Sequence, residues 1–161
     1  TPLNYKVYIT DDINANASAD GSVRVYSGLM DMMTDDELRF VLGHEIGHVA
    51  LGHTLKAMRL AYTAAAARQA AGSLNSTANA LSDSMLGDLM EEFLNAQFSQ
   101  SQELDADAYA MNFLKENNYN TAAAASSLRK LESLGSSGGF LSSHPNSGKR
   151  AEKMEELAKQ K

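Results

Sequence analysis

The chain has 161 residues, of which 43% are hydrophobic, and this size and composition suit one compact domain over residues 1–161. It carries 14 basic against 20 acidic residues, a formal net charge of -6, and no basic run that could neutralise phosphates, so nucleic acid is not expected as a partner. It has no cysteine, and any metal must therefore be held by His, Asp or Glu.

No uninterrupted apolar run reaches the roughly 20 residues that a membrane-spanning helix needs. The chain begins at Thr1 without a methionine, and we therefore expect an N-terminal segment to have been removed, together with any targeting signal. Membrane association is expected only through such a segment. Nothing in the sequence specifies an oligomeric state.

Two short segments with alternating β-branched and aromatic residues, 6–10 and 22–28, predict a pair of strands separated by the polar, turn-prone stretch NANASADG. A helix is predicted to begin at Thr34, because Thr34 and Glu37 form the sequence pattern of a capping box. Apolar residues at helical spacing follow, and Gly52 is the natural end of this helix.

Downstream of this helix, the apolar pattern predicts mostly helix and contains no internal repeat. The polar segment 72–84 is interpreted as a loop, a frayed helix or a mobile lid, and a Gly/Ser loop is expected over residues 135–143. The predicted helices cover residues 55–71, 85–116 and 121–134, and a charged last helix begins at about residue 147. The predicted fold class is therefore α+β and mainly helical.

Three of the four histidines lie in the stretch GHEIGHVALGH, and two of them belong to the pattern HExxH. On a helix, His44 and His48 are separated by about 6 Å of rise and about 40° of rotation, so both imidazoles can bind one ion. Zinc suits imidazole ligands, and a catalytic zinc commonly keeps three protein ligands and one position for water. Glu45 is close enough to reach that water and is the candidate general base.

The alternative is that the HExxH pattern arose by chance among ordinary helix residues. In a chain of this length an accidental match is expected roughly 0.5% of the time, given residue frequencies of a few per cent. With the buried helical context included, we interpret the pattern as a metal site.

A helix with HExxH supplies two ligands, and a third must come from elsewhere. His53 is five residues after His48, about 140° around a helix, and Leu51 and Thr54 stand where the longer motif HExxHxxGxxH needs glycine and histidine. We therefore leave His53 out of the ligand set and expect a structural role for it beside the site.

A better candidate for the third ligand lies in the stretch SQSQELDADAYA. Glu103 and Asp107 are at i and i+4 on a predicted helix, so Glu103 can complete a His-His-Glu set. Asp107 can accept a hydrogen bond from the ring of a ligand histidine. Without the HExxH helix, these two residues would be interpreted as a solvated acidic helix face.

Together, these motifs resemble the zinc metalloprotease family that includes HtpX, BepA, LoiP and the CAAX prenyl proteases, a gluzincin group. The family pattern is HExxH, a later ExxxD, and a C-terminal HP followed by Arg. The likeness extends over nearly the whole chain and is greatest to the soluble, envelope-located lipoprotein members. The matching residues are His44, Glu45, His48, Glu103, Asp107, His144, Pro145 and Arg150.

The resemblance implies a zincin-like core and a zinc-dependent endopeptidase that acts on unfolded or misassembled envelope proteins. It implies one zinc per chain, with the ligands His44, His48 and Glu103. Glu45 would take a proton from the zinc-bound water and pass it to the leaving amine, while His144 or Arg150 would supply the donor for the oxyanion. Alternatively, His144 would occupy the open zinc position in a resting state, or it is an ordinary exposed histidine of the loop. The implied location is the bacterial periplasm, with anchoring to the outer membrane as a lipoprotein.

The strand around Val23 and Val25 could offer an open edge to an extended substrate peptide, because main-chain pairing fixes a peptide without demanding a sequence. An internal strand of the sheet is the alternative. Two other classes of function stay open. One is a zinc-containing binding or chaperone-like module without proteolysis. In such a module the carboxylate of Glu45 would have no catalytic role. The other is a plain helical interaction domain with an accidental HExxH.

Overall fold

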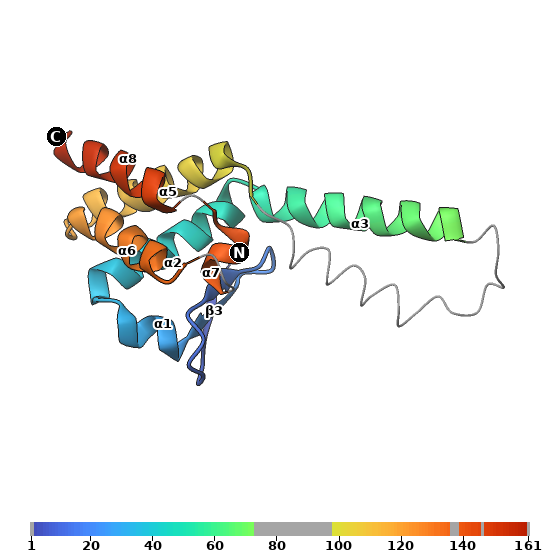
Figure 1. Ribbon diagram of the computed structural model, residues 1–161, viewed down its shortest axis with the longest axis horizontal. Helices are drawn as coiled ribbons and strands as arrows, with labels where there is room; N and C mark the ends of the chain where they lie inside the picture. Colours follow the sequence, from blue (N-terminus) through green and yellow to red (C-terminus); the bar gives the residue numbers. More distant parts are fainter. Residues whose placement is uncertain (1, 73–97, 136–138, 146, 161) are drawn as a thin grey trace.

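The computed structural model describes residues 2–72, 98–135, 139–145 and 147–160. Within these residues the fold is α+β and mainly helical, as predicted, with a small sheet beside a group of packed helices (Figure 1). None of the described helices is both long and apolar enough to span a membrane.

The sheet has three strands among the described residues, in the order β1-β3-β2. Strand β1 (Asn4–Tyr8) runs parallel to β3 (Ser22–Tyr26), and β2 (Ala15–Ala17) runs antiparallel to β3. The two predicted strands are confirmed with shifted bounds: β1 begins and ends two residues before the predicted 6–10, and β3 ends at Tyr26 because Ser27 begins a helix. Strand β2 was not predicted, because alanine and asparagine have little β-propensity and this strand forms only through its pairing with β3.

Strand β3 is the central strand of the sheet, and it is paired along both of its sides. The expectation that Val23 and Val25 would offer an open edge to substrate is therefore wrong. Both side chains are buried in the hydrophobic core instead. The open edge nearest the long helix α2 (Asp35–Ala50) belongs to β2, which packs against that helix.

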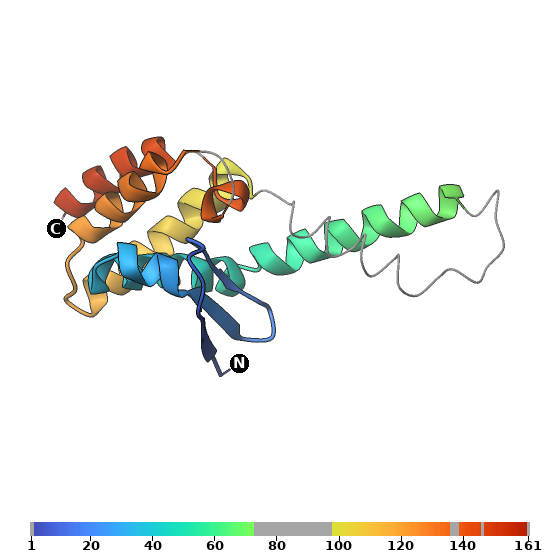
Figure 2. The same ribbon diagram turned by 60° about the horizontal axis from the view of Figure 1, so that its bottom comes forward.

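Helix α2 begins at the capping box that the sequence predicts. The Thr34 hydroxyl accepts the Glu37 N–H, and the Glu37 carboxylate accepts the Thr34 N–H at 2.8 Å. The helix ends at Ala50, and Gly52 adopts a positive φ of 74°, which turns the chain into α3 (His53–Gly72). Helix α3 projects away from the rest of the molecule (Figure 2).

The predicted helix over residues 85–116 differs from the structure at its start. Phe98 and Ser99 are not helical, and Ser99 caps α5 (Gln100–Glu116) in a second capping box, with Gln102 as its partner. Residues 73–97 lie outside the described residues, and with them the predicted start of that helix and the segment interpreted as a loop or lid.

The remaining helices largely follow the predicted pattern. Helix α6 (Ala122–Ser133) and helix α8 (Ser147–Lys159) are confirmed, and they pack side by side (Figure 1). Two short helices were not predicted: α1 (Ser27–Met32) directly after the sheet, and α7 (Phe140–Ser143) inside the expected Gly/Ser loop. Helix α2 contacts β2, α5 and α6, so the HExxH helix lies at the centre of the fold.

Small residues let α2 and α5 approach closely at the level of the HExxH motif. A Cβ on Gly43 would lie 3.3 Å from both the Cα and the Cβ of Ala110, and one on Gly47 would lie 3.3 Å from the Cα of Ala106. Glycine is costly inside a helix, and here the close packing offsets that cost. Because Gly43 and Gly47 directly precede the two motif histidines, the contact sets how near α5 comes to them.

Candidate metal centre

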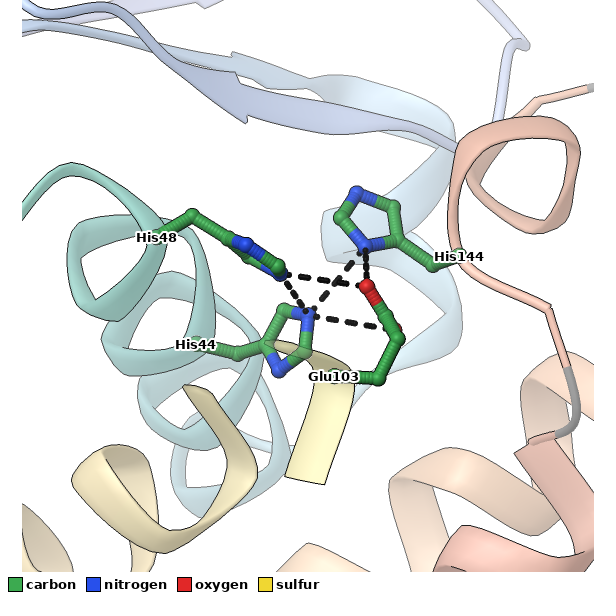
Figure 3. A group of neighbouring side chains, drawn as sticks. All are labelled: His44, His48, Glu103 and His144. Atoms are coloured by element: carbon green, nitrogen blue, oxygen red, sulfur yellow. Dashed lines mark hydrogen bonds and ion pairs between the residues drawn. The ribbon is translucent and has the colours of Figure 1, made fainter. Parts of the chain in front are cut away.

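Four side chains converge between α2, α5 and the loop that follows α7 (Figure 3). His44 and His48 come from α2, Glu103 from the first turn of α5, and His144 directly follows α7. All four side chains are buried. One nitrogen or oxygen atom of each could bind a metal, and these four atoms lie within 4.8 Å of one another. The structure therefore brings together the three predicted ligands and His144.

The distances within this group are short. His48 Nε2 lies 3.0 Å from His44 Nε2 and 3.2 Å from Glu103 Oε1. His144 Nδ1 lies 3.0 Å from Glu103 Oε1 and 3.2 Å from His44 Nε2. Three imidazole nitrogens and a carboxylate oxygen thus face a common point, which is the arrangement that zinc accepts.

Asp107 lies behind the first histidine, as the sequence predicts. Its Oδ1 is 2.8 Å from His44 Nδ1, on the side of the ring that faces away from the other three donors. Burial opposes ionisation of Asp107, but hydrogen bonds from Arg150 and His44 outweigh it and lower the pKa of Asp107. The ionised carboxylate therefore accepts the Nδ1–H of His44 and leaves the Nε2 lone pair free for a metal.

Arg150 takes a different place from the one predicted. Its Nε and Nη2 donate to the two carboxylate oxygens of Asp107, and its Nη1 lies against Glu103 Oε2. The guanidinium is almost fully buried, and all its nitrogens face these two carboxylates. Arg150 therefore does not face the open side of the site as an oxyanion donor, and that prediction is corrected: it holds the two carboxylates that surround the histidines.

The second histidine of the motif also has a partner on its outer side. His48 Nδ1 lies 3.2 Å from Nδ1 of His53, the first residue of α3. The ring of Phe98 stacks on His48 with centroids 3.9 Å apart and planes at 28°. Burial and the neighbouring His48 lower the pKa of His53, which favours its neutral form. His53 thus lies beside the site, outside the group of four donors.

His144 packs against two aromatic rings. Phe140 stacks on it with ring centroids 4.3 Å apart and planes at 17°. Phe98 also stacks on it, with ring centroids 5.3 Å apart and planes at 29°. The Phe98 N–H donates to the Ser143 carbonyl at 3.3 Å, which joins the start of α5 to the end of α7. His144 Nε2 lies 3.2 Å from Glu45 Oε1, so its ring touches both the donor group and the candidate base.

Glu45 is buried directly beside the four donors. Burial is the main cause that raises the pKa of Glu45 to about 8, with the negative charge of Glu103 acting in the same direction and His48 opposing both. A base whose pKa lies near neutrality is suited to proton transfer at neutral pH. Among the described residues, no well-aligned hydrogen bond reaches its Oε1, although His144 Nε2 lies 3.2 Å away.

The electrostatics of the donor group suit a cation. Burial and the positive charge of Arg150 lower the pKa of His44 to about 3, so this ring is neutral and can offer a lone pair. Burial opposes ionisation of Glu103, but His144 and His48 outweigh it and lower its pKa, so this carboxylate is ionised. A neutral imidazole at His44 and an ionised carboxylate at Glu103 are the forms that a divalent metal requires, and these residues therefore fit zinc.

Comparison with known protein families identifies the family of the chain. A model of peptidase family M48 matches residues 1–158. The chain belongs to peptidase family M48. The zincin-like α+β fold predicted from the motifs is consistent with this membership.

Among M48 relatives, two metalloproteases of Escherichia coli strain K12 are similar over almost the whole chain. LoiP is 48% identical over 153 residues and YcaL 48% over 154 residues, and each alignment covers 94% of this chain. The mitochondrial metalloendopeptidase OMA1 of Bos taurus is 29% identical over 178 residues, which cover 98% of this chain and 33% of OMA1. This chain spans only 61% of the length of LoiP and of YcaL.

Three residues beside the M48 centre had no predicted role or only a general one. Phe98 and Phe140 carried no signal, because their contacts with the histidines join segments that are far apart in the chain. His53 could be placed beside the site but not assigned a contact, since the turn at Gly52 brings its ring back toward His48.

Proposed function

We propose that this chain is the catalytic domain of a zinc-dependent endopeptidase of the gluzincin type, with Glu45 as its general base. The observation that carries the proposal is the position of Glu45. Its carboxylate is buried beside four metal-competent donors, and its Oε1 receives no well-aligned hydrogen bond from the described residues, with His144 Nε2 3.2 Å away. A purely structural metal site would have no use for such a carboxylate, whose burial is costly. Membership of M48 and the similarity to two metalloproteases support the same function.

In this proposal His44, His48 and Glu103 hold one zinc per chain. When bound, zinc would act as a Lewis acid toward the scissile carbonyl and toward water. The other steps depend on side chains of the protein. Asp107 holds the Nδ1–H of His44, and Glu45 accepts the proton of the attacking water and delivers it to the leaving amine, which completes hydrolysis of the peptide bond.

The substrate would be an extended polypeptide that pairs with β2. Within the part of the chain that the structure describes, one side of this strand is unpaired, and the strand packs against α2. The main chain of Ala17 helps to stabilise the Glu45 carboxylate, so the edge runs beside the candidate base. Main-chain pairing selects an extended conformation and little sequence, which suits unfolded or misassembled proteins of the bacterial envelope as substrates. From the family resemblance alone, we also propose that the enzyme is periplasmic and anchored to the outer membrane as a lipoprotein, which cell fractionation would test.

Metal analysis and a cleavage assay on unfolded casein test the proposal. The purified chain should bind one zinc and cleave casein. Glu45→Gln should keep the zinc and lose cleavage, because an amide cannot accept the proton, and Glu103→Ala should lose the zinc. Glu116→Gln, at the exposed end of α5, is the matched control and should behave like the parent. Cleavage by Glu45→Gln at the parental rate would overturn the proposed enzyme, in which Glu45 is the general base. Zinc binding without cleavage in the parent would favour a binding or chaperone-like module.

A resting state of the same site is favoured by one observation. His144 Nδ1 lies among the metal-competent atoms, 3.0 Å from Glu103 and 3.2 Å from His44. We infer that His144 acts as a fourth donor and occupies the position that a substrate carbonyl would need. Activity would then require His144 to leave the group, together with the loop after α7.

A further inference from the structure

His53 approaches the centre from a direction that helical geometry alone does not predict. Helix α2 ends at Ala50, and the positive φ of Gly52 starts a new helix at His53. The Lys56 N–H donates to the Gly52 carbonyl at 3.0 Å, which holds the first turn of α3 in place. The ring of His53 is thereby directed back onto His48, with ring centroids 5.2 Å apart and planes at 67°.

The contact between these two rings joins their Nδ1 atoms at 3.2 Å. A hydrogen bond between two imidazole nitrogens needs one protonated and one unprotonated atom. His48 uses its other nitrogen, Nε2, toward His44 and Glu103. If Nε2 is to offer a lone pair to a metal, the proton of His48 must be on Nδ1, and His53 Nδ1 must be the acceptor.

The two motif histidines are therefore supported in parallel but by different chemistry. Asp107 Oδ1 accepts from His44 Nδ1 at 2.8 Å, and it carries a negative charge. His53 Nδ1 lies at a longer distance of 3.2 Å from His48 Nδ1, and in this tautomer of His48 it would accept with a ring nitrogen instead of a carboxylate. Partners of this kind fix the tautomer and the orientation of a ligand, and their loss commonly weakens metal binding about 10- to 100-fold.

We propose that His53 is a positioning residue that accepts a hydrogen bond from His48 Nδ1–H and so holds the metal-binding tautomer and ring orientation of His48. The proposal rests on the proposed metal centre. It assigns His53 no contact with metal or substrate, since its Nδ1 lies on the side of His48 that faces away from the other donors.

Two substitutions separate the hydrogen bond from simple filling of space. His53→Leu keeps much of the volume but removes the acceptor. His53→Asn places an amide oxygen where Nδ1 lies and can still accept. Lys56→Leu, one turn further along α3, is the control: its side chain is exposed, and among the described residues no hydrogen bond or ion pair joins it to His48.

The experiment measures the Kd for zinc by competition with a chelator, for the parent and the three variants. We expect His53→Leu to bind zinc 10- to 100-fold more weakly than the parent, and His53→Asn and Lys56→Leu to stay within about threefold of it. Parental affinity in His53→Leu would overturn the proposal. Equal weakening in His53→Asn and His53→Leu would also overturn it, because it would show that the ring shape matters and the acceptor does not.

A second measurement separates this proposal from the proposed function. Long-range ¹⁵N–¹H NMR spectra of the zinc-loaded protein report which nitrogen of His53 carries the proton. If His53 Nδ1 accepts from His48, the proton of His53 must be on Nε2, and the parent should show this tautomer. If the parent bound zinc but did not cleave casein, the proposed function would fail while this tautomer still decided the role of His53. A proton on Nδ1 of His53 would overturn that role.

Discussion

Arg150 and Asp107 form a buried ion pair with two parallel hydrogen bonds. The Nε and Nη2 of Arg150 donate to Oδ2 and Oδ1 of Asp107, each at 2.7 Å, and both side chains are almost fully buried. Because Asp107 also accepts from His44, the pair connects α8 to the metal centre through α5. The guanidinium suits this place because it is planar and can bond both oxygens at once.

Breaking this pair should destabilise the protein and loosen the centre. Arg150→Ala leaves the Asp107 carboxylate buried without a cation, which typically costs about 3 to 5 kcal/mol. Urea unfolding should show a loss of this size, and zinc affinity should fall as well. Arg150→Lys keeps the charge but cannot bond both oxygens, so we expect it to lie between the parent and Arg150→Ala. Parental stability of Arg150→Ala would contradict the role that the contacts give to this pair.

Gly43→Ala should destabilise the protein, although alanine is favoured over glycine in a helix by about 1 kcal/mol. The new Cβ would meet Ala110 at 3.3 Å and force α2 and α5 apart by a few tenths of an ångström. Overpacking of this kind costs about 1 to 3 kcal/mol, and the separation should also weaken zinc binding, since the two helices carry different ligands.

The double variant Gly43→Ala with Ala110→Gly is the control for this contact. Removing the Ala110 methyl gives the new Cβ more room, so part of the lost stability and zinc affinity should return. Both are measured by urea unfolding and by chelator competition. If the changes in unfolding free energy of the two single variants simply added in the double variant, the proposed contact between Gly43 and Ala110 would be contradicted.

Glu37 should make folding stability depend on pH in the acid range. Burial opposes its ionisation, but hydrogen bonds from Lys130, Thr34 and Ser126 outweigh it and lower the pKa of Glu37 to about 2, from 4.5. A lowered pKa in the folded state means that the ionised form stabilises the fold above pH 4.5. This contribution is lost as the pH falls from about 4.5 toward 2.

Urea unfolding of the parent and of Glu37→Gln at several pH values measures that contribution. We expect Glu37→Gln to be less stable by about 1 to 3 kcal/mol at pH 7, because the amide loses the ion pair with Lys130. The difference should shrink as the pH approaches 2. Glu152→Gln changes an exposed carboxylate on α8 and should show no such pattern. A difference that stayed constant from pH 7 to pH 2 would contradict the role of ionised Glu37.

His144→Ala should raise peptidase activity. The ring of His144 places Nδ1 among the proposed ligand atoms and Nε2 3.2 Å from Glu45, so it occupies space that a substrate needs. Kinetics on casein or a fluorogenic peptide would measure the change, with Lys149→Ala as an exposed control. A fall in kcat with KM nearly unchanged, equivalent to about 2 to 4 kcal/mol of barrier, would instead assign His144 to the oxyanion. Activity equal to the parent would exclude both roles.

The local elements of this protein could be predicted from short stretches of the chain. The capping box at Thr34 and Glu37 and the stop at Gly52 depend on contacts within a few residues, so residue type and spacing were sufficient. The same holds for His44 and His48, whose i and i+4 spacing places them on one face of any helix that contains them.

The tertiary structure decided the relationships between distant segments. Strand β2 exists because β3 pairs with it, and this pairing moved the open edge away from Val23 and Val25. Arg150 lies 43 residues from Asp107 and bonds it only because α8 packs beside α5. Helical spacing specifies which side chains share a face, but it carries no information about which other segment that face will meet. That depends on the packing of the whole chain.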